Sequence, residues 1–186
     1  MANVLLPLAD GFEDLEAICV IDVLRRGGVA VVTAALGSSV DVMSARGIPM
    51  KADVMLDDVD DELFDAVVLP GGSEGTNRLR KSESLRSILQ RHNAEHRLLC
   101  AICAAPLVLL DAGVVDPELQ ITCYPTCQME LDRAWTPVPV VANGNIITGQ
   151  APGSSLLFAL VVLKALLGDA VAARVARGLV TDVLDA

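Results

Sequence analysis

A strand-length apolar run that ends at a cysteine and leads straight into a helix start is the feature that most constrains this fold. The run covers Arg97-Leu-Leu-Cys-Ala-Ile-Cys103, and a second apolar run, long enough for a helix, begins at Pro106. Proline suits a first helical turn because its missing N–H would have no intrahelical partner there. Such a turn lifts the residue at its apex out of the sheet, as the nucleophile elbow does for serine. We therefore predict a strand–Cys–helix elbow at Cys103.

Two interpretations of Cys103 are open at this point. The partial positive charge of unpaired N–H groups at a helix start favours thiolate, which would make Cys103 an activated nucleophile. Free cysteine is also among the residues most often buried as plain core, which would make it structural. The segment alone does not separate a reactive thiol from a packed one.

Short apolar runs alternate with helical periodicity along the rest of the chain. This alternation is typical of an α/β sandwich around a mostly parallel sheet, and no linker divides residues 1–186 into separate domains. Asn143-Gly144 lies between two apolar runs, suits a type I′ turn and predicts a hairpin. Strands are expected over residues 4–8, 29–35, 64–69, 120–123, 138–141 and 145–148, and one more is expected to lead into Cys103. One helix is expected to begin at about residue 14, an exposed one to cover 82–97, and a third to end at about 110. Two further helices are expected, one after residue 153 and one from residue 169.

The composition excludes several classes of partner. A net charge of −10 at pH 7 argues against nucleic acid, whose binding depends on clustered lysine and arginine. No apolar run reaches the roughly 18 residues that span a bilayer, and the N-terminus lacks the pattern of a secretory signal. Five cysteines, an odd number, favour reduced thiols over a disulfide framework. We expect a cytoplasmic protein with no membrane or nucleic-acid partner.

Three loops are expected at one edge of the sheet. In open α/β sheets, ligands bind outside the carboxyl ends of the strands. The loop with Glu13 to Glu16, the loop with Gly71 and Gly72, and the Cys103 turn each follow such a strand end. The fold logic predicts a ligand site where these three loops meet.

Four motifs at matching spacing carry a family resemblance. They are Asp10-Gly-Phe-Glu-Asp-Leu-Glu16, Leu69-Pro-Gly-Gly72, Ala101-Ile-Cys-Ala-Ala-Pro106 and Ala151-Pro-Gly-Ser154. Together they resemble the DJ-1/ThiJ/PfpI superfamily, most closely its DJ-1/YajL branch, from about residue 4 to the C-terminus. The resemblance implies a class I glutamine amidotransferase-like domain with a flavodoxin-like three-layer sandwich, and a homodimer.

The resemblance also assigns roles to individual residues. It implies a reactive cysteine at Cys103, a buried carboxyl partner at Glu16, and an anion pocket formed by the backbone N–H groups of Gly72 and Ala104. No metal and no cofactor are implied. The site-lining positions are Gly71, Tyr124 and Pro152, and two arginines near the site and the dimer interface are Arg26 and Arg46.

The pairing of Glu16 with Cys103 carries a physical condition. An ionised carboxylate beside the sulfur raises the thiol pKa by like-charge repulsion, whereas a protonated carboxyl donates a hydrogen bond to thiolate and lowers it. We therefore expect a raised pKa for Glu16 and a Cys103 pKa below about 7, against about 8.5 for a free thiol. The alternative is that Glu16 is only an acidic residue in a first helical turn, where the dipole favours it.

Several positions depart from relatives with other chemistry. PfpI-type proteases carry a histidine directly after the cysteine, where this chain has Ala104, so a cysteine protease is disfavoured. Tyr124 stands where some relatives place a site histidine, and a phenol with a pKa near 10 is a poor base. His92 and His96 have i, i+4 spacing on the expected exposed helix, but without a third ligand a solvated face is favoured over a metal site.

Three further cysteines are less specific. Cys100 and Cys103 have the CxxC spacing of redox motifs, but Cys100 falls inside the expected strand, so core packing is favoured. Cys123 and Cys127 lie either near the site or in the core, and the sequence does not decide between these positions.

Two functions from different classes remain open. The first is a cofactor-independent glyoxalase, with deglycase activity as a variant, which would serve in defence against carbonyl and oxidative stress. In it, Cys103 attacks methylglyoxal or glyoxal and Glu16 moves the proton. The second is a non-enzymatic redox sensor or redox-regulated chaperone, in which Cys103 is oxidised to sulfinate. Both functions use the same site.

The first helix predicts how two copies of the chain would meet. It has apolar residues over more than one face, as a helix between its own sheet and a partner requires. We expect a two-fold interface with contributions from Leu15, Ile18, Cys19, Asp22, Arg25 and Arg26.

Overall fold

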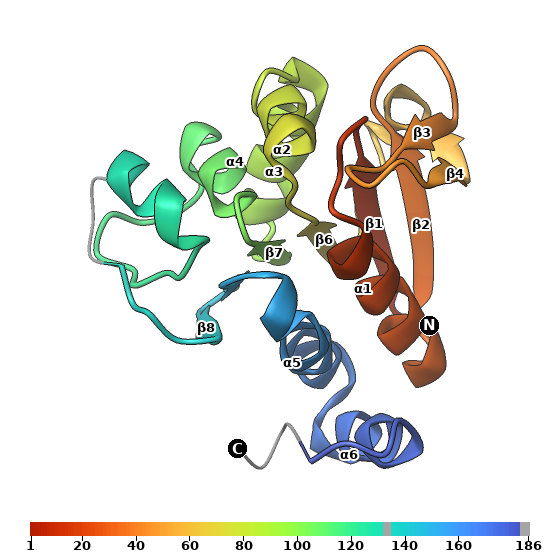
Figure 1. Ribbon diagram of the computed structural model, residues 1–186, viewed down its shortest axis with the longest axis vertical. Coiled ribbons are helices and arrows are strands. Elements are labelled where there is room, and N and C mark those ends of the chain that lie inside the picture. Colours follow the sequence, from red (N-terminus) through yellow and green to blue (C-terminus); the bar gives the residue numbers. More distant parts are fainter. Residues whose placement is uncertain (132–134, 183–186) are drawn as a thin grey trace.

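A computed structural model describes residues 1–131 and 135–182 of the chain (Figure 1). Within these residues, the central sheet has seven strands in the order β5-β2-β1-β6-β7-β9-β8. Neighbouring strands pair parallel except β8, which pairs antiparallel with β9. The strands are β1 (Asn3–Leu8), β2 (Ala30–Ala35), β5 (Val54–Met55), β6 (Ala66–Leu69), β7 (Leu98–Ile102), β8 (Val140–Asn143) and β9 (Ile146–Gly149).

Helices cover both faces of this sheet, which confirms the predicted α/β sandwich (Figure 1). On one face lie α1 (Asp14–Gly27) and α5 (Ser155–Leu167), with α6 (Asp169–Gly178) packed against both. The other face is covered by α2 (Ser73–Arg80), α3 (Glu83–Ala94) and α4 (Pro106–Asp111).

The central strands are buried on both faces, so successive side chains enter opposite cores. In β1, Leu6 packs with the core under α1 and α5, while Leu5 packs with the core under α2, α3 and α4. In β7, Cys100 likewise packs with the core under α1 and α5, and Leu99 packs with the core under α2, α3 and α4. This double burial explains why the strands appear in the sequence as unbroken apolar runs.

Two local signals fix the ends of α1. At its start, the Glu13 carboxylate accepts a hydrogen bond from the backbone N–H of Glu16 at 2.8 Å, which satisfies a donor that the helix leaves unpaired. At its end, Gly28 has φ 90° and its N–H donates to the carbonyl of Arg25 at 3.1 Å. The helix therefore begins directly beside the carboxyl end of β1.

A small second sheet lies against the loop between β1 and α1. Its strands are β3 (Asp41–Met43) and β4 (Pro49–Lys51), paired antiparallel. The N–H of Gly11 donates to the Met43 carbonyl at 2.7 Å, and the N–H of Ala45 donates to the Phe12 carbonyl at 2.7 Å. These bonds dock the β3–β4 connection onto the edge of the main sheet. Short 3₁₀ turns lie at η1 (Leu56–Val59), η2 (Pro125–Glu130) and η3 (Pro152–Ser154).

Two strand predictions need correction. No strand forms over residues 120–123, where Ile121 makes only an isolated bridge to Trp135, because the N–H of Thr122 donates to the Thr148 hydroxyl and not to a neighbouring backbone. The predicted hairpin is present as β8 and β9, but Asn143 pairs with Ile146. Its central turn residues are thus 144 and 145, and only Gly144 has a positive φ, 58°, as a type II′ turn requires.

The exposed helix expected over 82–97 is shorter and hides one of its histidines. It ends as α3 at Ala94, and His92 is completely buried. Nε2 of His92 accepts from the backbone N–H of Phe64 at 2.9 Å, and Nδ1 lies 2.7 Å from the Ile88 carbonyl, so Nδ1 carries the proton. His92 is therefore a satisfied core histidine, and the predicted solvated face is wrong at this position.

Residues 1–131 and 135–182 contain no group of three or more His, Cys, Asp or Glu side chains arranged to hold a metal ion. None of the described helices is long and apolar enough to cross a membrane.

Candidate active site

Cys103 stands at the predicted elbow between β7 and α4. Its φ is 65°, a left-handed conformation that is uncommon for a side chain other than glycine and recurs at functional turns. Its N–H donates to the Gly149 carbonyl at 3.0 Å, which holds the turn against β9. The residue is only 8% exposed. The elbow therefore presents the thiol at the carboxyl edge of the sheet, in a nearly closed setting.

The loop after β6 passes directly against this thiol and requires glycine at two positions. A Cβ at Gly71 would lie 2.7 Å from the Cβ of Cys103 and 2.8 Å from Glu16 Oε2. Gly72 has φ 91°, and a Cβ there would lie 2.2 Å from the Gly11 carbonyl oxygen. The backbone N–H groups of Gly72 and Ala104 both act on the Cys103 sulfur and lower its pKa. These are the two N–H groups to which the family resemblance assigns an anion pocket.

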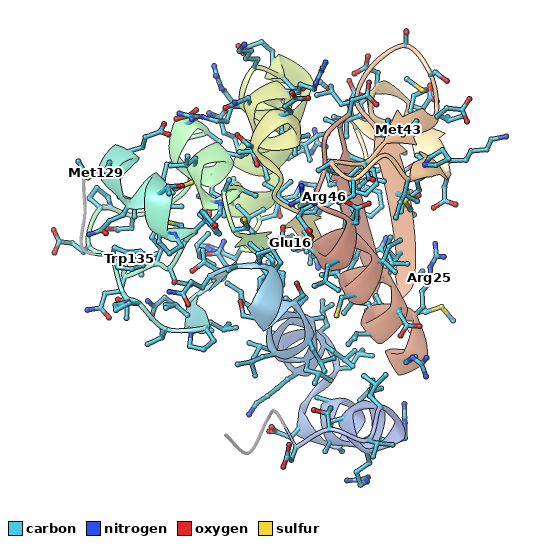
Figure 2. All side chains as sticks on the ribbon, viewed as in Figure 1. Glu16, Arg25, Met43, Arg46, Met129 and Trp135 are labelled. Atoms are coloured by element: carbon cyan, nitrogen blue, oxygen red, sulfur yellow. The ribbon has the colours of Figure 1, made fainter. Side chains whose placement is uncertain are left out.

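Glu16 reaches the same point from the first turn of α1 (Figure 2). It is completely buried, and its Oε2 accepts from the Gly71 N–H at 2.6 Å. Its Oε1 has no hydrogen-bond partner among the described residues. Burial is the main cause that raises the pKa of Glu16 to about 7. The hydrogen bond from Gly71 lowers this pKa, the charge of Glu13 raises it, and the hydrogen bond with Cys103 lowers it. The expected raised pKa of Glu16 is confirmed.

The pKa of the Cys103 thiol is raised, opposite to the expected value below about 7. Burial is the main cause; the charge of ionised Glu16 and the hydrogen bond from the thiol to this carboxylate raise it further. The helix start favours the thiolate, but so little of the thiol is exposed that burial outweighs this effect. Since both groups resist ionisation beside each other, Glu16 and Cys103 compete for one negative charge and titrate as a pair.

A cavity of about 640 Å³ opens over the thiol. Of the expected site residues, Tyr124, Pro152 and Arg46 line it, together with Cys103, Gly72 and Ala104. Gly71 lies behind the cavity, between the thiol and Glu16. Arg26 does not reach the cavity: it lies in the last turn of α1, half exposed, with its Nε bonded to Asp22 at 2.7 Å.

The β3–β4 connection forms one wall of the cavity, which the sequence did not predict. The wall consists of Met43 at the end of β3 and of Ser44, Ala45 and Arg46 in the connection. Asp14 at the start of α1 anchors this wall, because its two carboxylate oxygens accept from the Ser44 hydroxyl and the Arg46 N–H. No local signal reveals this wall, since it depends on contacts between segments about 30 residues apart.

The remaining cysteines divide between core and cavity, and all five thiols are free. Cys100 is completely buried in β7, which raises its pKa and confirms its predicted core role. Cys123 is also buried, with its sulfur 3.4 Å from the Tyr124 carbonyl. Cys127 lines the cavity and is partly exposed. Of the two cysteines that the sequence left open, Cys123 therefore belongs to the core and Cys127 to the cavity.

Comparison with known proteins places this arrangement in a family. The model of the DJ-1/PfpI family matches residues 2–165. The chain belongs to the DJ-1/PfpI family. Protein DJ-1 homolog B of Arabidopsis thaliana is 36% identical over 167 residues, which is 89% of this chain and 38% of that protein. The chain thus spans about two fifths of the length of this DJ-1 relative.

Two further DJ-1/PfpI relatives bear on the site. The Caenorhabditis elegans protein named glutathione-independent glyoxalase DJR-1.2 is 35% identical over 171 residues, covering 90% of this chain and 89% of its own. The solved structure of oxidized Toxoplasma gondii DJ-1 superposes with a TM-score of 0.93 at 33% identity, covering 98% of this chain and all of that one.

Proposed function

We propose that this DJ-1/PfpI protein is a cofactor-independent glyoxalase that converts methylglyoxal or glyoxal to the corresponding hydroxy acid. The observation that carries the proposal is the buried Glu16 carboxyl, with a pKa near 7, beside the elbow thiol and its two N–H donors. The name of the C. elegans relative supports the same reaction class.

The first step uses both members of the pair. As the Cys103 sulfur attacks the aldehyde carbon, the thiol proton passes to ionised Glu16, so no free thiolate has to accumulate. The carbonyl oxygen becomes negatively charged as the C–S bond forms. The N–H groups of Gly72 and Ala104 would stabilise that oxygen, which then takes the proton back from Glu16 to give a hemithioacetal and leave Glu16 ionised.

The second step is a proton shift between the two carbons of the dicarbonyl. Glu16 removes the C–H proton of the hemithioacetal carbon, and the neighbouring carbonyl oxygen takes up the electron pair as an enediolate. Return of the proton from Glu16 to the second carbon, with transfer of the hydroxyl proton of the first carbon to the enediolate oxygen, gives a thioester of the hydroxy acid. Water then cleaves the C–S bond, which releases lactate or glycolate and restores the thiol. The same attack on an aldehyde adduct would underlie a deglycase activity.

A redox role for Cys103 is the second candidate. The specific observation is the N–H pocket of Gly72 and Ala104 around the sulfur, which would hold the oxygens of a sulfinate, with protonated Glu16 as a further donor. The solved T. gondii relative is described as oxidized. Treatment with peroxide should then add two oxygen atoms at Cys103 and leave Cys100 unmodified, as seen by peptide mass spectrometry.

We also propose that the protein forms a homodimer through the exposed face of α1. Leu15 and Ile18 are 56% and 54% exposed there, and the adjoining β3–β4 hairpin exposes Met43 and Ile48. Apolar side chains gathered in this way mark a contact surface. Sedimentation should give about twice the 19.5 kDa mass, and Ile18→Glu should yield the monomer; a parent protein that sediments as a monomer at micromolar concentration would refute this interface.

The enzymatic proposal is tested by lactate formation. Metal-free protein is incubated with methylglyoxal without glutathione, and lactate is measured by an enzyme-coupled assay. The parent should form lactate, and Cys103→Ser should form none. Cys100→Ser is the matched control, because it removes a thiol from the same strand without touching the cavity, and it should remain active. Lactate formation by Cys103→Ser would remove the thiol from the mechanism.

A further inference from the structure

The cavity over Cys103 has an uneven charge. Three carboxylates line it, from Asp10, Glu13 and Glu74, and they are opposed by the single guanidinium of Arg46 among the described residues. The formal charges of these four side chains leave a net charge of −2 around the mouth. None of the three carboxylates takes part in the chemistry proposed above.

Of these three carboxylates, Glu74 is positioned by the packing of its backbone and not, among the described residues, by a bond to its side-chain oxygens. It lies in the first turn of α2, and Gly11 makes room for it: a Cβ on Gly11 would lie 2.6 Å from Glu74 Cβ and 3.4 Å from Oε2. The N–H of Gly75 donates to the Gly11 carbonyl at 3.3 Å, which presses this turn against the β1–α1 loop. No hydrogen bond or ion pair to the Glu74 carboxylate occurs among residues 1–131 and 135–182.

The other charged side chains at the mouth differ from Glu74 in their bonding. Asp10 Oδ1 accepts from the Met43 N–H at 2.8 Å, and Glu13 Oε2 accepts from the Glu16 N–H at 2.8 Å. Both carboxylates therefore hold loops in place. Arg46 is exposed on the β3–β4 connection, across the cavity lining from α2, and supplies the opposing charge.

We infer that Glu74 and Arg46 set the charge selectivity of the Cys103 site, so that it accepts neutral carbonyl compounds and rejects carboxylates. This inference rests on the proposed function for its substrate class. Methylglyoxal and glyoxal are neutral, whereas the hydroxy acid released is an anion. A negative mouth admits the substrate and repels the product, since like charges across a wet cavity still interact measurably.

The N–H pocket deeper in the cavity does not conflict with this selectivity. Gly72 and Ala104 act on the sulfur and on an oxygen attached to the attacked carbon, where charge develops during the reaction. The charged side chains at the mouth act on the charge that a substrate or reagent carries before it reacts. The two regions therefore distinguish a transient oxyanion from a permanent carboxylate.

The test measures alkylation of Cys103, which does not depend on glyoxalase activity. Iodoacetamide and iodoacetate have nearly the same size and differ by one negative charge. With either reagent, the sulfur forms a bond to the CH₂ carbon, iodide leaves, and the thiol proton passes to solvent. The rate constant at Cys103 is followed by peptide mass spectrometry for each reagent. The ratio of the two rates cancels the thiolate fraction, because both reagents meet the same sulfur.

The expected ratio of iodoacetamide to iodoacetate exceeds that of a small neutral thiol by about fivefold at low ionic strength and falls towards it in high salt. Glu74→Gln should lower the ratio about twofold, and Arg46→Gln should raise it by a similar factor. Glu95→Gln is the matched control, since it removes the same charge from an exposed residue at the end of α3, away from the cavity, and should leave the ratio unchanged.

A ratio equal to that of the small thiol, or one that Glu74→Gln does not move, would overturn the inference. Failure of the proposed function is a separate result. If the parent protein forms no lactate from methylglyoxal but shows the salt-sensitive ratio, the glyoxalase proposal falls and the charge selectivity of the thiol site stands.

Discussion

Glu16 and His92 are both titratable side chains with no exposed surface, yet the molecule holds them in opposite ways. His92 lies in the core beneath α3, and both of its ring nitrogens have backbone partners, the Phe64 N–H and the Ile88 carbonyl. Oε2 of Glu16 accepts from the Gly71 N–H, whereas its Oε1 is buried without a hydrogen-bond partner in the part of the chain that the structure describes.

We interpret this difference as that between a buried group that serves the structure and one that serves the proposed reaction. A buried polar atom without a partner is destabilising, so a fold that keeps one at a cavity, beside a nucleophile, points to chemistry. Burial also moves the two pKa values in opposite directions. It raises the pKa of Glu16 to about 7 and lowers the pKa of His92 below its ordinary value. In the proposed mechanism, Glu16 therefore carries a proton near neutral pH, whereas His92 stays neutral.

The largest expected difference between Glu16 and His92 is in the turnover of methylglyoxal. Glu16→Gln keeps an acceptor for the Gly71 N–H but cannot carry a proton, so lactate formation should fall by about 10²-fold or more. A matched substitution at the other group, His92→Phe, should leave turnover per folded molecule unchanged. Initial rates on methylglyoxal, scaled to the folded fraction, decide this. Equal rates for Glu16→Gln and the parent would remove Glu16 from the mechanism.

The pH dependence of stability should carry opposite signs for the two groups. The folded pKa of Glu16 is raised from 4.5 to about 7, so its contribution is fully present below pH 4.5 and is lost as the pH rises through about 7, by roughly 3 kcal/mol. The folded pKa of His92 is lowered from 6.5, mainly by burial. Its contribution is present above pH 6.5 and is lost as the pH falls through the folded value.

Urea denaturation across this pH range should resolve the two contributions. Glu16→Gln should abolish the loss of stability that the parent shows on the alkaline side, and His92→Phe should reduce the loss on the acid side. A parent-like pH profile in Glu16→Gln would mean that this carboxyl has an ordinary pKa in the folded protein.

A smaller effect is expected on stability at neutral pH when His92 is replaced. His92→Phe preserves the ring that stacks on Phe64, at 6.2 Å between centroids, but leaves the buried Phe64 N–H without an acceptor. The free energy of unfolding should fall by about 1–3 kcal/mol. A variant as stable as the parent would show that this hydrogen bond is not what holds His92 in the core.

The same contrast explains what the sequence could predict. The elbow at Cys103, the glycine pair after β6 and the carboxyl partner all lie in short motifs next to strand ends, so local patterns and the family resemblance located them. His92 was misjudged because its burial depends on Phe64, 28 residues away. The family resemblance placed Arg46 near the site, but the rest of its wall and Glu74 were missed, because they reach the cavity through contacts between loops.

The pKa of Cys103 was misjudged for a related reason. A helix start and a carboxyl partner are visible in the sequence, but the depth at which the elbow buries the thiol is not. That depth makes burial the leading influence and couples the thiol to the charge of Glu16. The geometry of the pair was predictable, whereas the balance of its electrostatics required the folded structure.

Titration of the Cys103 thiol tests the central claim, that Glu16 and Cys103 compete for one negative charge. Thiolate absorbance is followed against pH in the parent and in Glu16→Gln, with the corresponding Cys103→Ser protein subtracted from each. Removing the charge while keeping an amide that donates to sulfur should lower the Cys103 pKa by about one unit or more. An unchanged or higher thiol pKa in Glu16→Gln would contradict the coupling.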